Sequence, residues 1–152
     1  MAPPVNVHAT AIRINQTGLM FAGPSGWGKS MLAFTCLTEA RRLGLPAMLV
    51  ADDQAFVEHR DGKVIARRPD SIAGLIELRG TGIVSLDSIP EAVMHFAILP
   101  ASVSGPDRLP PDNEQIEVAE GFALPVIRLL ANTSVPLAIL MAKAPEIGME
   151  CR

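Results

Sequence analysis

The segment GPSGWGKS at residues 23–30 constrains the fold of this chain more than any other stretch. It matches the pattern G-x-x-x-x-G-K-[ST], in which the glycines let backbone N–H groups converge on phosphate and the lysine adds a positive charge. The apolar run LMFAG leads into the segment, and apolar residues at helical spacing follow from Lys29. The sequence therefore predicts a strand, a phosphate-binding loop and an amphipathic helix in succession.

The residues before this loop favour a mixed sheet. VNVHATAIRI (5–14) alternates and is rich in β-branched residues, NQTG (15–18) is typical of a turn, and LMFAG supplies a second strand. Such a hairpin places an antiparallel pair where a simple doubly wound nucleotide-binding fold opens with one parallel strand. We therefore expect an α/β fold with a mixed β-sheet.

The remaining elements follow from periodicity and turn residues. The helix that begins at Lys29 should stop at Gly44 and Pro46. AMLVADD (47–53) predicts a buried strand ending in two acids, and FVEHRDGKVIARRP (56–69) predicts two strands around an Asp-Gly turn. Later segments predict a strand at 92–101, a strand or loop at 122–131 and a helix at 135–144. No linker separates these segments, so we expect a single domain over residues 1–152.

Composition and charge exclude several classes of protein. A chain of 152 residues with 49% hydrophobic residues can bury a substantial core. A net charge of −3 without a Lys/Arg cluster argues against binding to nucleic acid. The N-terminal residues lack a signal-peptide pattern, and no apolar run approaches the ~20 residues needed to span a bilayer. We expect a cytoplasmic protein without a membrane partner.

Two adjacent acids are the next candidates for chemistry. Asp52 and Asp53 end an apolar strand, where consecutive side chains diverge. One carboxylate can then face a metal ion and the other an attacking hydroxyl, as phosphoryl transfer requires. The 23 residues from Lys29 to Asp52 fit one helix and a short return connection.

Other candidates are ambiguous on local evidence alone. His8 lies within a predicted strand, where a histidine is more often structural than catalytic. Glu77 and Arg79 are two residues apart and share one face if extended, so an ion pair between them is the simpler interpretation. Arg108 lies in a Pro-rich turn region and fits a surface position.

The order of these motifs is more specific than any one of them. VHATAI, GPSGWGKS, LVADDQ, IAGLIELRGTGI, DRLP and LPV occur in this sequence in one order along nearly the whole chain. In that order and approximate spacing, the chain resembles the catalytic domain of HPr kinase/phosphorylase, the serine kinase of the phosphotransferase-system carrier HPr. The resemblance implies a nucleotide-binding core like that of phosphoenolpyruvate carboxykinase, ATP and Mg²⁺ as cofactors, an HPr-type carrier as substrate, and a homo-oligomer, specifically a hexamer.

The resemblance also implies roles for particular residues. Asp53 corresponds to the proton acceptor for the serine hydroxyl, and His8 and Arg108 correspond to an active-site histidine and arginine. Ser30 and Glu77 correspond to metal-associated positions, and Asp52 joins them as the metal-facing acid of the strand end described above. The nucleotide loop consists of Gly23, Pro24, Ser25, Gly26, Trp27, Gly28, Lys29 and Ser30, with Lys29 on the phosphates.

The sequence also departs from the family pattern. Pro24 and Met31 stand where the family usually has Glu, and the segment PVRPGRN of long members, linked to dephosphorylation, is reduced to PVIRLLAN at 125–132. The chain begins almost at the active-site histidine, as in short forms without an N-terminal domain. Phosphorylase activity therefore stays open. Two other classes also stay open: a small-molecule kinase or carboxykinase-like enzyme, and a nucleotide-sensing module.

Overall fold

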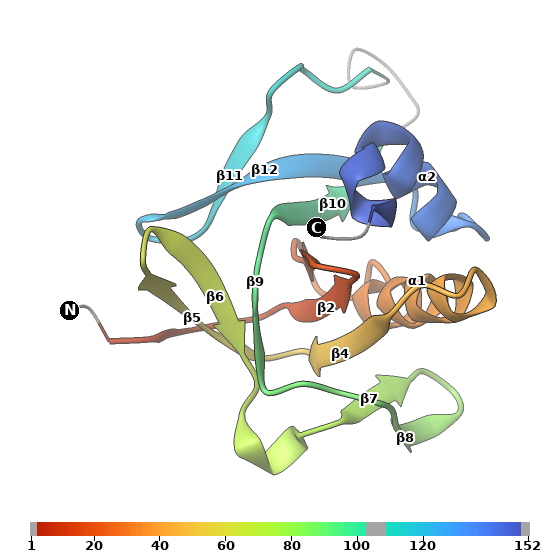
Figure 1. The fold of residues 1–152 in the computed structure, drawn as a ribbon, viewed down its shortest axis with the longest axis horizontal. Helices are drawn as coiled ribbons and strands as arrows, with labels where there is room; N and C mark the ends of the chain where they lie inside the picture. The colour runs from red at the N-terminus through yellow and green to blue at the C-terminus, as the bar shows by residue number, and fades with distance from the viewer. Residues whose placement is uncertain (1–2, 103–108, 150–152) are drawn as a thin grey trace.

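A mixed six-stranded sheet forms the middle of the computed structural model, which describes residues 3–102 and 109–149 (Figure 1). Strand β10 runs parallel to both of its neighbours, and the other pairs are antiparallel. The prediction of a mixed sheet is therefore confirmed. In spatial order the strands are β11 (Gln115–Ala119), β12 (Phe122–Leu129), β10 (Phe96–Pro100), β3 (Thr17–Phe21), β2 (Thr10–Ile14) and β4 (Ala47–Ala51).

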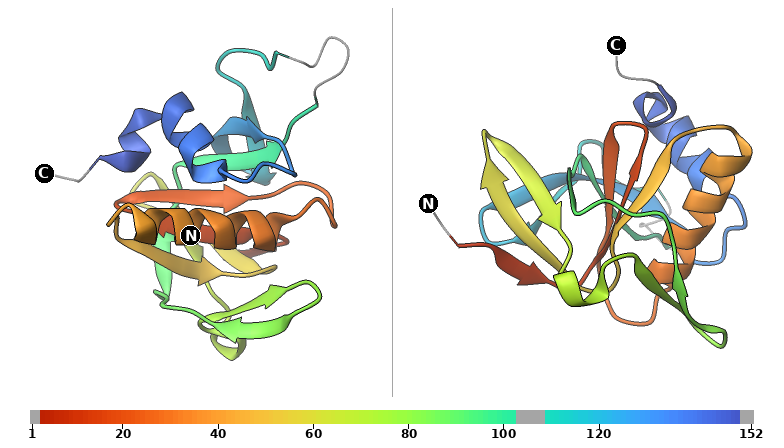
Figure 2. Two further views of the ribbon diagram at one scale, coloured as in Figure 1. Left: turned by 90° about the vertical axis from the view of Figure 1, so that its right-hand side faces the viewer. Right: turned by 60° about the horizontal axis from the view of Figure 1, so that its bottom comes forward.

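Two helices cover one face of this sheet. Helix α1 (Lys29–Arg42) and helix α2 (Pro136–Lys143) contact each other and lie on the same side of the molecule, as the left panel of Figure 2 shows. A short 3-10 helix, η3 (Pro145–Gly148), follows α2. Ile12 and Ile14 of β2 are fully buried in the core beneath these helices, since alternate residues of a strand share a face.

A second, four-stranded antiparallel sheet covers the opposite face. Ala11 and Met20, which alternate with the residues facing the helices, are buried in the core between the two sheets. At Gly18 the sheets come so close that an added Cβ would lie 1.9 Å from the Val93 carbonyl oxygen. The strands in order are β1 (Val5–Val7), β5 (Ala55–Arg60), β6 (Lys63–Arg67) and β9 (Glu91–Val93).

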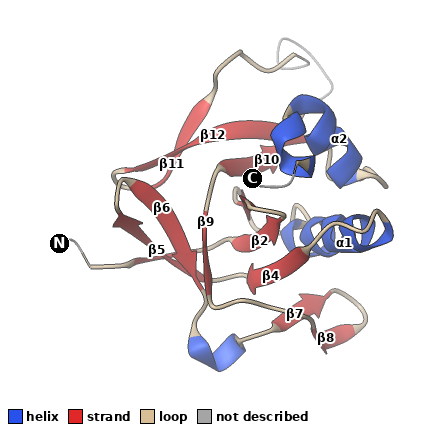
Figure 3. Cartoon of the chain, in the orientation of Figure 1, coloured by secondary structure: helices blue, strands red, loops and turns tan. Residues whose placement is uncertain are grey.

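A separate hairpin stands beside the edge of the six-stranded sheet. It is formed by β7 (Leu75–Leu78) and β8 (Gly82–Ser85), and the 3-10 helix η1 (Asp70–Ile72) precedes it (Figure 3). Leu49 of β4 exchanges backbone hydrogen bonds with the segment that follows the hairpin, and β7 contacts α1. The hairpin is thereby held next to the end of β4.

Most predicted elements are confirmed, including α1, α2 and the hairpins β2–β3 and β5–β6. The prediction of one continuous strand over 5–14 is wrong, because the chain leaves the four-stranded sheet after β1 and enters the six-stranded sheet at β2. The strand expected at 92–101 is likewise divided between the two sheets as β9 and β10. Among the described residues, neither helix is long and apolar enough to cross a membrane.

Candidate active site

The glycine-rich loop at 23–30 joins β3 to α1. Gly23, Gly26 and Gly28 have φ angles of 98°, 85° and 105°, in the left-handed region that favours glycine. Gly28 is the N-cap of α1, without a side-chain cap and without an acidic residue in the first turn. The first N–H groups of the helix, and its positive end, are therefore available to an anion.

Lys29 holds its charge inside this loop. The residue is 7% exposed, and its Nζ donates to the carbonyl oxygens of Gly23 at 3.3 Å and Pro24 at 3.1 Å. Burial lowers the pKa of Lys29 from its ordinary value, and the negative charge of Asp53 opposes this change. The loop thus carries a cation whose hydrogen bonds to carbonyl groups a phosphate can replace.

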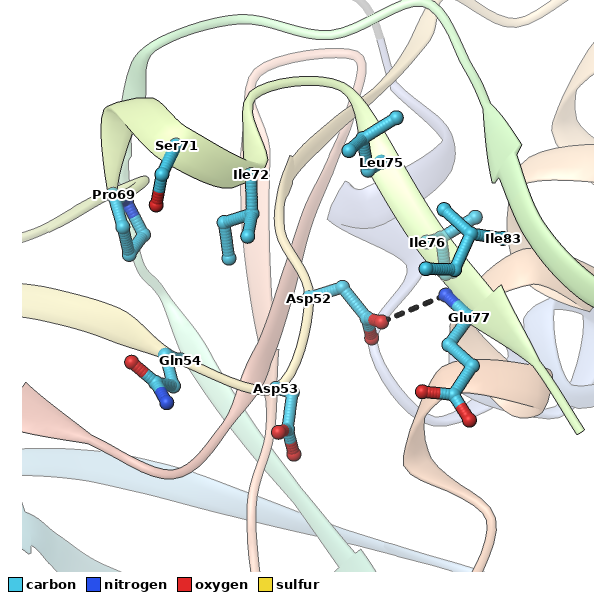
Figure 4. Close-up of a pocket in the computed structure, with 10 residues that line it drawn as sticks. All are labelled: Asp52, Asp53, Gln54, Pro69, Ser71, Ile72, Leu75, Ile76, Glu77 and Ile83. Carbon is cyan, nitrogen blue, oxygen red and sulfur yellow. Dashed lines mark hydrogen bonds between the residues drawn. The ribbon is translucent and has the colours of Figure 1, made fainter.

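Asp52 is buried at the end of β4 and joins several elements through its carboxylate. Its Oδ1 accepts hydrogen bonds from Ser30 Oγ at 2.5 Å and from Thr10 Oγ1 at 3.0 Å. Its Oδ2 accepts from the backbone N–H of Glu77 at 3.0 Å (Figure 4). One carboxylate therefore fixes the start of α1, the start of β2 and strand β7 relative to one another.

Asp53 occupies a strained position between the two sheets. Its φ is 69°, and Gln54 N donates to Asp52 O at 2.8 Å, which closes a γ-turn around Asp53. The side chain is 60% exposed, and Oδ1 lies 3.1 Å from Nε2 of His8, which also lies 3.4 Å from Ser25 Oγ. The turn directs the carboxylate outward, away from the core that surrounds Asp52.

These side chains line one cavity of about 550 Å³. The structure therefore brings together nine of the predicted site residues, which come from separate segments of the sequence: His8, Ser25, Gly26, Gly28, Lys29, Ser30, Asp52, Asp53 and Glu77. The remaining lining residues are Met31 and Arg79.

A second cleft of about 330 Å³ adjoins the same acids (Figure 4). It shares Asp52, Asp53 and Glu77 with the first cavity, so these three residues border both spaces. In the described part of the chain, no Lys, Arg or His lines this cleft. Its other lining residues are Gln54, Pro69, Ser71, Ile72, Leu75, Ile76 and Ile83.

Several predicted residues lie elsewhere. Gly23, Pro24 and Trp27 belong to the loop but do not line the cavity. The Trp27 indole N–H donates to Ala22 O at 2.7 Å, and its ring packs against the core on the helix side of the sheet. Arg108 lies outside the described residues.

Arg128, in the shortened C-terminal motif, also lies away from the cavity. It donates to the carboxylate of Glu114 and, at 2.9 Å, to the Pro100 carbonyl oxygen. In that position it belongs to β12, next to the edge strand β11, and it contributes no charge to the cavity lining.

Two residues of the site were not predicted to belong to it: Arg79, for which the sequence favoured an ion pair with Glu77, and Thr10. Arg79 lines the cavity, and within residues 3–102 and 109–149 the ion pair that was expected between it and Glu77 is absent. The shared-face spacing of Glu77 and Arg79 was the available signal. Thr10, buried beside the two acids, has no local signal because its partners are about 40 residues away in the chain.

The donor set fits Mg²⁺ held together with a nucleotide. The Ser30 hydroxyl donates a hydrogen bond to Asp52, so the lone pairs of Ser30 Oγ remain available to a metal ion. Ser30 and Glu77 line the same cavity. Over the described ranges there is no group of three or more His, Cys, Asp or Glu residues that could hold a metal by itself. Mg²⁺ ordinarily keeps several waters and uses one or two carboxylates plus substrate phosphates, so such a group is not required.

A family model and several curated proteins match the sequence of this chain. The model of the HPr Serine kinase C-terminal domain matches residues 1–91. HPr kinase/phosphorylase of Clostridium perfringens (strain 13 / Type A) is 32% identical over 89 residues, which cover 59% of this chain and 27% of that protein. HPr kinase/phosphorylase of Clostridium botulinum (strain Alaska E43 / Type E3) is 28% identical over 140 residues, covering 85% and 43%. The chain thus matches less than half the length of these curated relatives.

A solved structure shares the fold. The Hpr(Ser) kinase/phosphatase from Coxiella burnetii superposes with a TM-score of 0.72 and covers 94% of this chain, while 97% of that chain is covered in return. Sequence identity is 20%, so this likeness concerns the arrangement of helices and sheets.

Proposed function

Because the chain belongs to the HPr serine kinase C-terminal domain family, we propose that it is a protein serine kinase that uses MgATP to phosphorylate an HPr-type carrier. The observation that carries this proposal is the position of Asp53. This exposed residue borders both the cavity that contains the glycine-rich loop and the cleft whose described lining lacks basic residues. A base in this position can reach a hydroxyl group that enters through the cleft. The same base faces a phosphate group held in the cavity.

The glycine-rich loop would hold the triphosphate of ATP. Its N–H groups and those at the start of α1 would donate hydrogen bonds to the phosphate oxygens, while Lys29 would exchange its carbonyl partners for the β and γ phosphates. Ser30, Asp52 and Glu77 would hold Mg²⁺, which supplies charge neutralisation at the phosphates when bound. In this assignment, the glycine-rich loop is a phosphate-binding loop, and the fold around it is a nucleotide-binding core like that of phosphoenolpyruvate carboxykinase.

Asp53 would act as the proton acceptor. The Oγ–H bond of the acceptor serine breaks and its proton passes to the Asp53 carboxylate, as Oγ bonds to the γ-phosphorus and the bond to the β-phosphate oxygen breaks, leaving ADP. His8 Nε2, 3.1 Å from Asp53 Oδ1, would orient that carboxylate and donate to it. Arg79, which lines the cavity, would face the transferring group with its positive charge.

The cleft beside Asp53 favours a polypeptide acceptor over a small anionic one. Its described lining has no Lys or Arg to bind a phosphate or carboxylate of a small substrate. Apolar side chains lie along it instead, and Ile83 and Leu75 are 69% and 37% exposed. A surface of this kind suits a serine carried on a folded protein with apolar neighbours. A purely nucleotide-sensing module would not need an exposed acid between cavity and cleft.

The test is transfer of radiolabelled phosphate from ATP to purified HPr-type carriers. We expect the wild-type chain to label a serine, and Asp53→Asn to lose this transfer while it still binds ATP. Binding can be read from Trp27 fluorescence, since the chain has one Trp and no Tyr. Asp61→Asn is the matched control, because Asp61 also has a positive φ (55°) but lies in the β5–β6 turn.

Two outcomes would contradict the proposal. The first is wild-type transfer by Asp53→Asn, which would remove Asp53 from the mechanism. The second is efficient phosphorylation of a small metabolite with no labelling of any carrier, which would favour the small-molecule kinase. Phosphorolysis of the phosphorylated carrier is tested separately, by supplying phosphate and measuring pyrophosphate. A cytoplasmic location and a homo-oligomeric assembly complete the proposal.

A further inference from the structure

We propose that Thr10 is a positioning residue for phosphoryl transfer, acting mainly through Asp53; this inference rests on the function proposed above. Thr10 is completely buried, and its single hydroxyl makes two hydrogen bonds. It donates to Asp52 Oδ1 at 3.0 Å and accepts from the backbone N–H of Asp53 at 3.2 Å. A hydroxyl can do both at once because it has one donor and two acceptor sites.

The position of Thr10 follows from an irregularity between β2 and β4. Ala11 pairs with Ala51, but the next residue, Ile12, pairs with Leu49, so Val50 is an extra residue on β4. Such a bulge bends a strand and changes the direction of the side chains beyond it. Here it places Thr10 opposite the turn that begins at Asp52, with the hydroxyl under the peptide of Asp53.

The Thr10 hydroxyl stabilises the unfavourable backbone conformation of Asp53. Asp53 has a φ of 69°, which a residue with a side chain rarely adopts, and its N–H has Thr10 Oγ1 as partner. Without this acceptor, the buried side of the turn would contain an N–H group with no partner, and the turn would relax. The Asp53 carboxylate would then move relative to His8 and to the γ-phosphate.

Asp52 would be affected less than Asp53. Its carboxylate would still accept from Ser30 Oγ and Glu77 N after loss of the Thr10 hydroxyl. The magnesium and nucleotide side of the site would therefore keep its geometry. The inference thus predicts a separation of effects, in which transfer falls and nucleotide affinity stays near that of the wild type.

Three substitutions test this. Thr10→Val keeps the shape but removes the hydroxyl, and Thr10→Ser keeps the hydroxyl but removes the methyl group. Thr17→Val is the matched control: Thr17 is also buried, at the far end of the same hairpin, and its hydroxyl makes no hydrogen bond within the described residues. For Thr10→Val we expect kcat to fall by roughly 10²-fold, the scale of a 1 Å displacement of a reacting group. We expect Thr10→Ser to recover most of the rate, and Thr17→Val to match the wild type.

Two further measurements separate positioning from general destabilisation. The Kd for MgATP, read from Trp27 fluorescence, should change less than threefold, roughly the scatter between conservative variants. The amide proton of Asp53 should exchange with solvent faster in Thr10→Val than in Thr10→Ser. If Thr10→Val does not fold, Thr10→Cys takes its place, because a thiol is only a weak donor and acceptor.

The outcomes distinguish this inference from the proposed function. Wild-type kcat in a folded Thr10→Val, or equal loss in Thr10→Val and Thr10→Ser, would overturn the role of the hydroxyl. If the wild-type chain labels no carrier, the proposed function fails, and the amide exchange of Asp53 still decides whether Thr10 holds the turn. Equal exchange in all variants would then overturn the inference.

Discussion

Asp52 and Asp53 are adjacent in the chain, yet their carboxylates lie in opposite environments. Asp52 is 8% exposed and accepts three hydrogen bonds, whereas the side chain of Asp53 is 60% exposed and lies beside His8. The γ-turn at Asp53 produces this difference by turning the backbone at the point where β4 ends. One acid therefore holds the site together, and the other faces incoming groups.

The first prediction follows from this contrast. Asp52→Asn should lower the free energy of unfolding by about 1.5–3 kcal/mol, the range for a hydrogen-bonded charged group, because an amide cannot replace all three accepted bonds. Asp53→Asn should change it by less than about 0.5 kcal/mol, as expected for an exposed side chain. Urea denaturation of both variants measures the difference. Equal losses in the two variants would show that burial does not separate the roles of these acids.

The second prediction concerns His8. Its Nε2 lies within hydrogen-bond distance of Asp53 Oδ1, so His8→Ala should remove an orienting donor from the proposed base. We expect transfer to the carrier to fall on the order of 10²-fold, the lower range for groups in acid–base catalysis, with the affinity for ATP retained. His8→Gln keeps an N–H donor and should fall less.

His59→Ala is the control for His8. His59 lies in strand β5, where it stacks on Phe122 with ring centroids 4.2 Å apart, and it does not line the cavity. Its loss should leave transfer unchanged. Equal rates for His8→Ala and His59→Ala would exclude a direct role for His8.

The third prediction is a pH dependence of stability. Gly18 N donates to Nδ1 of His95 at 2.9 Å, which requires a ring without a proton on Nδ1. Burial lowers the pKa of His95 from its ordinary value of 6.5, and the charge of Lys63 lowers it further. Because the unfolded chain takes up this proton more readily, the stabilising contribution is complete above about pH 6.5 and is lost as the pH falls through the lower folded-state pKa.

The measurement is denaturation at pH 7.5 and pH 5.5, on either side of the ordinary histidine pKa of about 6.5. His95→Asn keeps an acceptor near the position of Nδ1 but cannot titrate. We expect the wild-type protein to lose more stability than this variant between the two conditions. The same loss in both would mean that other groups cause the pH dependence.

Elements with local signals could be predicted from the sequence. The helix after the glycine-rich loop follows from apolar spacing and from Gly44, which adopts a φ of 76° after the last turn. The β5–β6 hairpin follows from Asp61 and Gly62, which both have positive φ. In these cases the residues that determine the structure are neighbours in the chain.

The crossings between sheets could not be predicted in this way. The chain changes sheets at His8 and Ala9, and again at Met94 and His95, without a Gly or Pro at either place. What determines these points is packing between strands that are far apart in the sequence. The prediction of continuous strands there failed for that reason.

Most residues of the candidate site could be predicted from the sequence, but their arrangement could not. Spacing and family resemblance gave the loop, the two acids, His8 and Glu77, which the structure brings to one cavity. They did not show which acid is buried, because that depends on the γ-turn and on the bulge in β4. Thr10 was missed because a buried hydroxyl in a strand has the same sequence signal as any other β-branched residue.

The close approach of the two sheets at Gly18 also affects the position of Asp53. The link that carries Asp53 starts in the six-stranded sheet and ends in the four-stranded one, so its course depends on how far apart the sheets stand. That separation is set where Gly18 meets the Val93 carbonyl group. A methyl group at Gly18 would push the two sheets apart. The proposed base, Asp53, would then move out of line with the phosphate, although no residue of the cavity had been substituted.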